Sequence, residues 1–191
     1  MGIPIPYISL AQQILRLIGD DAQIRVVASQ FFDTIHSCMP IISKKLFYDR
    51  LLNPLAKPRA DVVLMCLCMK VATWSPPECN SNPQTRDYIS AKQYLIEVEV
   101  AGVFTLQVLQ ANLLIALYEL GHGIYPSAYM SISACATYAF ALDLETEMTE
   151  SATSQFTWVE QEERRRVSWA IVILERFKAQ NKVKIKILAC C

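Results

Sequence analysis

The seven cysteines are the residues whose chemistry would be easiest to recognise, because thiolates bind zinc at a characteristic spacing. They are Cys38, Cys66, Cys68, Cys79, Cys135, Cys190 and Cys191. No C-x2-C pair of a zinc site occurs among them. Cys66 and Cys68 are two positions apart, so on a helix their side chains point about 200° apart and cannot share one metal ion. We therefore expect no metal ligands here and interpret the cysteines as free thiols in a reducing compartment.

The two histidines and the paired acids could serve catalysis, but each lacks the partners that catalysis needs. His36 has no serine or cysteine beside it in a recognisable nucleophile context, so we assign it a packing role. His122 stands between two glycines, which suits a turn. Asp20 and Asp21 lack the further acids of a magnesium–diphosphate site. We predict no catalytic, cofactor-binding or metal-binding residue, and an all-helical enzyme ranks last among the possible functions.

Residues 158–177, WVEQEERRRVSWAIVILERF, hold the densest group of charges in the chain. Apolar side chains recur at three- and four-residue spacing from Val167 to Leu174, which predicts the buried face of one helix. Glu162 stands four residues before Arg166, the favourable order for an ion pair on a helix surface. Arg165 and Trp169 share a second face on the flank of the core. The residue types alone predict a structural helix with solvated charges.

Composition narrows the class of protein. Hydrophobic residues make up 53% of the 191, which indicates one domain with a substantial core. The longest apolar runs, at 113–117 and 134–142, are shorter than the roughly 18 residues that span a bilayer, and the amino terminus lacks the basic region of a secretory signal. Because 18 basic and 18 acidic side chains balance, this chain is not expected to grip DNA phosphates by itself. We expect a soluble, intracellular protein.

Helical periodicity covers almost the whole sequence, and the fold class that it predicts is all-α, an irregular array of roughly seven to eight helices. The expected helices span residues 9–18, 22–39, 44–52, 61–74, 86–101, 106–120, the stretch that follows Tyr125, and 158–177. We expect Gly121 to supply a left-handed cap and Pro126 to occupy a first helical position. Residues 75–85 are predicted to form a loop, and 145–157 an acidic linker.

The last residues depart from the helical pattern. Lys182, Lys184 and Lys186 alternate with apolar residues, a period of two that favours a strand. We interpret residues 178–191 as an atypical basic tail after a C-terminally truncated domain. Truncation would leave apolar surface exposed on the 106–120 and 167–177 helices. The predicted division is a loosely ordered segment at 1–19, a helical domain at 20–177 and the tail.

Three stretches together resemble the fungal-specific transcription factor domain, the helical regulatory region found downstream of binuclear zinc-cluster modules. In 158–177 the matching residues are Trp158, Glu162, Glu163, Arg164, Arg165, Trp169, Leu174, Arg176 and Phe177. Between 31 and 51 they are Phe31, Phe32, His36, Pro40, Ile41, Ile42, Lys45, Phe47 and Leu51. A weaker third match comprises Ala136, Ala139, Leu142 and Leu144, with Asp143 where a glycine is common and Thr137 where an arginine is usual.

The resemblance implies a nuclear protein that regulates transcription under the control of a protein co-regulator or a small-molecule effector. It also implies DNA and zinc binding through a zinc-cluster module, but the C-x2-C-x6-C run of that module does not occur in this sequence. We therefore expect no cofactor in this chain. The alternative, from another class, is a helical scaffold or protein-interaction module without DNA binding, although no repeat of about 30–45 residues supports it.

Overall fold

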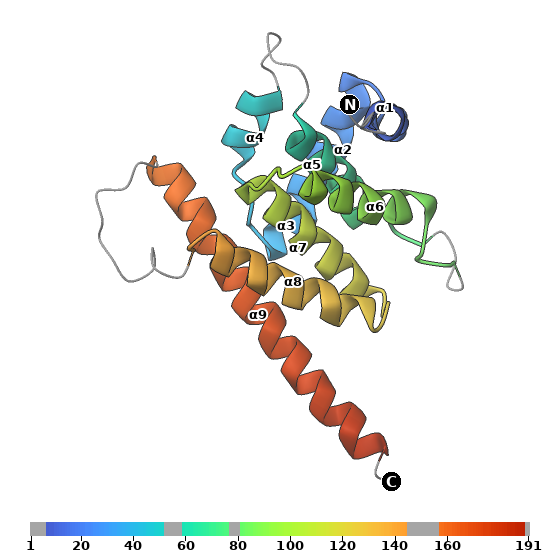
Figure 1. Cartoon of the computed structure of the whole chain (residues 1–191), viewed down its shortest axis with the longest axis vertical. Helices are drawn as coiled ribbons and strands as arrows, with labels where there is room; N and C mark the ends of the chain where they lie inside the picture. Colours follow the sequence, from blue (N-terminus) through green and yellow to red (C-terminus); the bar gives the residue numbers. More distant parts are fainter. Residues whose placement is uncertain (1–6, 52–58, 77–80, 145–156, 190–191) are drawn as a thin grey trace, which may run out of the picture.

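The computed structural model describes residues 7–51, 59–76, 81–144 and 157–189, and every regular element in these ranges is a helix. The helices are α1 (Tyr7–Ile18), α2 (Asp21–Asp33), α3 (Ile35–Cys38), α4 (Lys44–Leu51), α5 (Ala60–Ala72), α6 (Arg86–Val100), α7 (Leu106–Gly121), α8 (Ser127–Ala141) and α9 (Trp158–Ala189) (Figure 1). The predicted all-α fold is confirmed.

Helices α5 and α7 form the centre of the molecule. α5 packs against α1, α2, α6 and α7, and α7 also contacts α8 and α9. Their side chains are buried almost all round, as Leu64 and Leu67 on α5 and Leu109 and Ile115 on α7 illustrate. This burial is what a helix that is apolar on every face requires. The core therefore lies along these two helices, and the others cover it.

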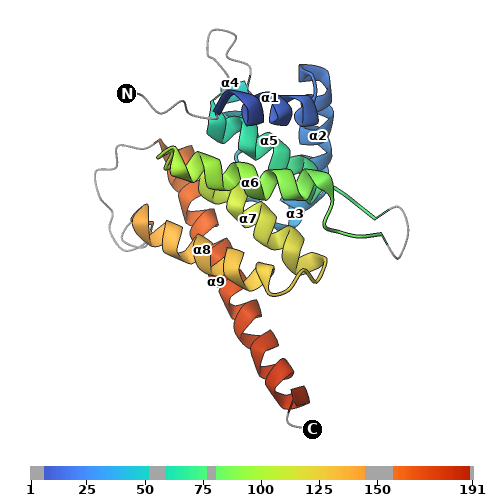
Figure 2. The same ribbon diagram turned by 45° about the vertical axis from the view of Figure 1, so that its right-hand side comes forward.

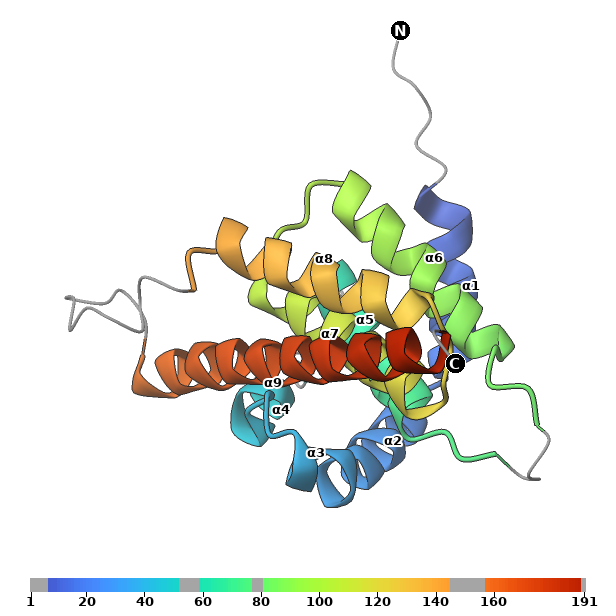
Figure 3. The ribbon, with the colours of Figure 1, turned by 90° about the horizontal axis from the view of Figure 1, so that it is seen from below.

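Helix α9 crosses the outside of the array beside α8, as Figure 3 shows from below. Its first half lies against the body, and its second half projects beyond it toward the C-terminus (Figures 1 and 2). The residues facing the body, among them Val167, Ala170 and Leu174, are buried as the periodicity predicts. α9 is thus half a packed helix and half a projecting one.

Three helices end in the same left-handed turn. The residue with positive φ is Gly102 after α6 (75°), Gly123 after α7 (66°) and Asp143 after α8 (56°). In the last case the Leu144 N–H donates to the Ala139 carbonyl at 3.1 Å and the Asp143 N–H to the Phe140 carbonyl at 3.0 Å, the pattern of a Schellman motif. A glycine is favoured at such a position because it has no Cβ to clash.

Two predicted cap assignments need correction. The left-handed glycine after α7 is Gly123, while Gly121 is still part of the helix. Pro126 is the N-cap of α8 and not its first helical residue. Both corrections move a boundary by one or two residues, the scale on which helix ends vary.

Two longer segments also differ from expectation. The predicted helix at 22–39 is interrupted at Thr34, whose hydroxyl donates to the Gln30 carbonyl at 2.6 Å and so competes with the helical backbone. The strand preference predicted for residues 182–187 is wrong, because α9 continues to Ala189. Extending an existing helix costs less than starting a new element, and a lone strand would have no ladder partner.

The predicted exposure of apolar surface is half right. Helix α7 is buried between its neighbours, so the expectation for 106–120 is wrong. On α9, by contrast, Trp169, Ile173 and Phe177 are exposed. The domain boundaries at 19/20 and 177/178 stay predictions, although Ile14 and Ile18 of α1 are buried in the core. The predicted linker up to residue 156, residues 77–80 of the predicted loop, Cys79, Cys190 and Cys191 lie outside the described residues.

Candidate functional site

Glu163 of α9 is a buried carboxylate that meets the start of another helix. Its Oε1 accepts a hydrogen bond from the Ser43 N–H at 2.6 Å. Ser43 directly precedes α4, so the negative charge lies at the positive end of that helix dipole. The Ser43 hydroxyl in turn accepts from the Leu46 N–H at 3.3 Å, as an N-cap side chain does. Glu163 therefore helps to fix where α4 begins.

The connection at 40–43, between α3 and α4, is held from two further directions. The Nε2 of Gln110 on α7 donates to the Ile41 carbonyl at 2.6 Å, and Nη1 of Arg166 on α9 donates to the Pro40 carbonyl at 3.5 Å. Ile41 itself is buried. Buried backbone groups outside a helix need such partners. The connection is thereby attached to both α7 and α9.

Arg164 joins the end of α8 to α9. Its Nη2 donates to the carbonyl of Leu142, the C-cap residue of α8, at 2.9 Å. A positive charge is favourable at the C-terminal end of a helix. The three stretches that were singled out in the sequence, around 31–51, 136–144 and 158–177, therefore meet at the first three turns of α9.

Glu162 lies on the outer side of α9 and binds two arginines. Its carboxylate is 2.8 Å from Arg165 and 2.8 Å from Arg166. Hydrogen bonds from both guanidinium groups lower the pKa of Glu162 to about 2. The expected pair with Arg166 is present, and Arg165 shares the same carboxylate. Because the Arg165 face is exposed, both pairs are solvated and contribute little to stability.

A hollow of about 210 Å³ opens beside these contacts, between the start of α9 and the 36–44 segment. Its walls include His36, Pro40, Lys44, Trp158 and Arg166. Burial and the positive charges of Arg166 and Lys44 lower the pKa of His36, so its imidazole is neutral at physiological pH. The ring also lies against Phe32, with 5.1 Å between centroids. The hollow could hold a small molecule, but its residues include no nucleophile paired with a base.

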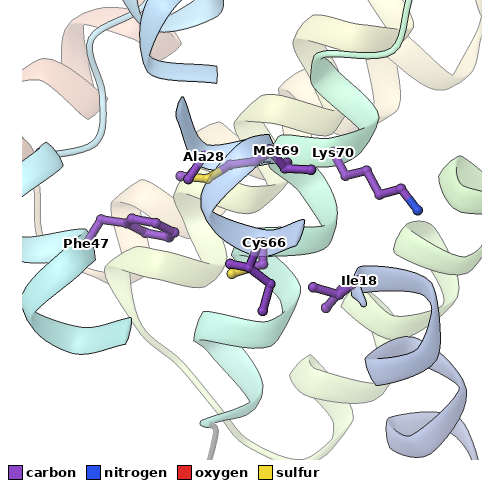
Figure 4. Close-up of a pocket in the computed structure, with 8 residues that line it drawn as sticks. Ile18, Ala28, Phe47, Cys66, Met69 and Lys70 are labelled. Atoms are coloured by element: carbon purple, nitrogen blue, oxygen red, sulfur yellow. The ribbon is translucent and has the colours of Figure 1, made fainter. Parts of the chain in front are cut away.

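A second, apolar pocket lies among α1, α2, α4 and α5 (Figure 4). Side chains such as Ile18, Phe47, Cys66 and Met69 fill it and leave no room for a water molecule. Figure 4 shows the Lys70 side chain leading away from these residues. Its Nζ donates to the Leu17 carbonyl at 2.6 Å and pairs with Asp87 at 2.9 Å. This region is packed core and not a cavity for an effector.

The cysteines within the described ranges are free thiols. Cys66, Cys68 and Cys135 are buried, and Cys38 is exposed. Burial raises the pKa of Cys66 to about 12 and raises the pKa values of Cys68 and Cys135 as well, so all three stay protonated and unreactive. In the part of the chain that the structure describes, no three His, Cys, Asp or Glu side chains are grouped so that they could hold a metal ion.

Sequence reasoning identified the charged helix but not the roles of Glu163 and Gln110. Both carry a signal that could have revealed them, because each polar side chain falls within an apolar stripe. Glu163 precedes Val167 by four residues, and Gln110 is surrounded by buried residues of α7. Glu119, a third such residue, accepts from the Tyr88 hydroxyl at 2.7 Å and pairs with Lys92 at 3.0 Å. Polar residues inside an apolar stripe therefore indicate ties between helices.

The comparisons with known proteins place the three stretches that meet at α9 in one family domain. The profile of the fungal specific transcription factor domain matches residues 28–179. The chain therefore belongs to that family, whose members regulate transcription and are not enzymes. The matched range takes in α3 to α8, the last six residues of α2 and the part of α9 that carries Glu163 and Arg164.

Relatives of the chain come from several fungi. It is 34% identical over 158 residues to Transcription factor BOA15 of Botryotinia fuckeliana, covering 82% of this chain and 86% of that protein. It is 26% identical to Transcription factor tazR of Aspergillus terreus over 77% of this chain, and 25% identical to an uncharacterised transcriptional regulatory protein of Schizosaccharomyces pombe over 71%. The chain spans only 24% and 20% of these two proteins. No solved structure gives a significant match.

These findings define the chain as a regulatory domain that acts in transcription regulation. Within the described residues, the helices are too short or too polar to cross a membrane.

Proposed function

We propose that the chain works in the nucleus as a regulatory module that contacts a co-regulator or an effector, while a separate zinc-cluster module binds DNA. The observation that carries this proposal is that three consecutive arginines of α9 bind partners inside the domain. Arg164 binds the end of α8, and Arg165 and Arg166 share the carboxylate of Glu162. Arg164 and Arg166 therefore join α9 to other parts of the domain, and Arg165 is paired on the surface of α9.

Charge supports the same division of labour. Affinity for DNA comes mostly from cations that neutralise phosphates, and the chain as a whole carries a formal net charge of zero. Arg164, Arg165 and Arg166 already have partners inside the domain. Zinc is likewise assigned to the separate module, so the purified chain should retain no stoichiometric zinc after dialysis.

DNA binding by the chain alone tests this proposal. Fluorescence anisotropy with a labelled duplex should show only weak binding that does not depend on sequence and disappears as salt is raised. A non-specific Kd in the range of about 10⁻⁴ to 10⁻⁶ M is the expected limit at physiological salt. Tight, sequence-specific binding that resists salt would overturn the proposal.

A transcription reporter assay with a fusion protein distinguishes a regulatory module from the alternative, a passive helical scaffold. The chain is fused to an unrelated DNA-binding module, and transcription from its target promoter is compared with that of the module alone. We expect the fusion to raise or lower transcription. The Glu163→Ala variant should weaken this effect because it loosens α4, and Glu162→Ala, a neighbouring acid on the exposed side, should retain it. A fusion without any effect would favour the scaffold.

A further inference from the structure

A larger hollow, of about 410 Å³, lies between α1 and α6. The two helices contact each other, and Figure 2 shows them on the same side of the molecule. Ile14 and Leu17 of α1 and Ile89 of α6 form its apolar walls, and Ile14 is fully buried. Sites for small molecules usually measure about 300–1,000 Å³ and combine apolar walls with a few polar groups. The size of this space, which we term the α1–α6 hollow, therefore suits a small organic molecule.

Polar side chains line the α1–α6 hollow as well. Arg86, Ser90 and Gln93 recur at four- and three-residue spacing, so they share one side of α6. Gln13 of α1 lines the same space. Within the described ranges, none of these four side chains has a hydrogen bond or an ion pair with another residue. Their hydrogen-bonding groups are therefore available to a ligand.

Lys70 of α5 fixes the two walls relative to each other. Its Nζ donates to the Leu17 carbonyl of α1 at 2.6 Å and pairs with Asp87 of α6 at 2.9 Å. Leu17 is itself a wall residue, and Asp87 directly follows Arg86. Because one ammonium group joins both helices, the walls are held in place before a ligand arrives. Such preorganisation lowers the ordering cost of binding.

The charge of the α1–α6 hollow has one sign. Among the described residues that line it, Arg86 alone is charged, and it has no ion pair within the described part of the chain. The adjacent Asp87 is neutralised by Lys70. Arg86 is also the first residue of α6, where the positive end of the helix dipole lies. Since a guanidinium group binds a carboxylate through two parallel hydrogen bonds, the hollow favours an organic anion.

The smaller hollow beside α9 shows no such preference. The positive charges of Lys44 and Arg166 are offset there by the carboxylates of Glu162 and Glu163. The α1–α6 hollow also differs in its relation to the family, because α1 ends before residue 28, where the match to the family begins. One of its two walls is therefore a feature of this chain outside the matched range.

We propose that the α1–α6 hollow binds a small organic monoanion, a carboxylate with an apolar body, whose charged group is held by Arg86. The apolar body packs against Ile14, Leu17 and Ile89. Because such a ligand contacts both helices, its binding stabilises the docking of α1 on α6. The inference rests on the proposed function in one respect, since it gives the effector of the regulatory module a site and a chemical class.

Hexanoate and its uncharged analogue hexanamide test the site on the purified 191-residue chain. The two probes share the same apolar chain, so a difference in affinity reports the carboxylate. In NMR titrations, hexanoate should shift the amide signals of residues 13–17 and 86–93 more than those of α8, with a dissociation constant of about 1 mM. Hexanamide should bind about tenfold more weakly or worse. Equal affinities, or no binding of hexanoate up to tens of millimolar, would overturn the proposal.

A pair of arginine variants tests the role of Arg86. Arg86→Gln removes the charge but keeps a polar side chain, so the affinity for hexanoate should fall about tenfold or more while that for hexanamide stays the same. The matched control is Arg25→Gln on α2, an exposed arginine outside the hollow, which should bind hexanoate like the wild type. Both arginines are exposed, so both variants should keep the wild-type melting temperature. Full affinity in Arg86→Gln, or equal losses in the two variants, would overturn the proposal.

The transcription reporter separates this inference from the proposed function. A fusion that regulates transcription, together with a chain that does not bind hexanoate, would keep the proposed function and overturn the site. A chain that binds hexanoate through Arg86, together with a fusion without effect, would keep the site and contradict the proposed function.

Discussion

Glu163 shows how one side chain can connect separate parts of the domain. A buried carboxylate is costly unless hydrogen bonds and favourable charges surround it. Here the Ser43 N–H and the positive end of α4 supply both. Glu162, its neighbour in sequence, makes two ion pairs on the exposed side and contributes less. Two adjacent acids therefore have different roles because neighbouring residues of a helix point about 100° apart, one into the core and the other toward the surface.

Replacing these acids should give unequal losses of stability. Glu163→Ala leaves the Ser43 N–H without its acceptor, and we expect the free energy of unfolding to fall by about 1–3 kcal/mol. Glu162→Ala removes solvated pairs only, so the loss should stay below about 1 kcal/mol. Urea denaturation followed by circular dichroism measures both. Equal losses would show that Glu163 is not the tie that its geometry indicates.

His36 should make stability depend on pH. Burial and the charges of Arg166 and Lys44 lower its pKa in the folded chain, whereas the unfolded chain binds a proton near pH 6.5. The unfolded state therefore holds more protons between these two values, and stability decreases as pH falls below about 6.5. Denaturation midpoints between pH 5 and 7.5 should show this decrease in the wild type and a smaller one in His36→Gln. An identical pH dependence in both would exclude His36 as its source.

At the scale of the element, the end of α8 depends on one unusual backbone position. Asp143 adopts a φ of 56°, which side chains other than glycine rarely take without strain. We predict that Asp143→Gly is more stable than Asp143→Ala by about 1 kcal/mol, because only glycine takes this conformation freely. Thermal denaturation of the two variants measures the difference. A more stable alanine variant would contradict the assigned turn.

The sequence indicated most elements because local signals and packing agree. The expected helices lie within one to three residues of α1 and α4 to α8, where apolar periodicity, caps and prolines coincide. The sequence also marked Asp143 as standing where glycine is common, and the structure supplies the reason. It failed at Thr34 and in the tail. There, a single side-chain hydrogen bond and the continuation of a helix outweighed the pattern.

The candidate site was less accessible to sequence reasoning. Its charged residues were visible, but the contacts that give them roles join residues far apart in the chain, such as Glu163 and Ser43. No local pattern specifies which backbone group a buried carboxylate will meet. The resemblance to a family named the right stretches, and only the fold showed that they meet at α9.

For the whole molecule, α5 and α7 are the elements on which the rest depends. Leu114 on α7 is almost fully buried, so Leu114→Ala should lower the free energy of unfolding by about 2–5 kcal/mol. Val100→Ala, at an exposed position on α6, should change it by less than about 0.5 kcal/mol. Urea denaturation compares the two. Similar effects would mean that α7 does not lie in the core.

Amide hydrogen exchange at Ser43 is the measurement that tests the central claim most directly, namely that α9 ties the family's separate stretches into one domain. The Ser43 amide should exchange slowly in the wild type and in Glu162→Ala, and much faster in Glu163→Ala while core amides of α7 stay protected. Rapid exchange at Ser43 in the wild type, or protection that survives Glu163→Ala, would contradict the claim.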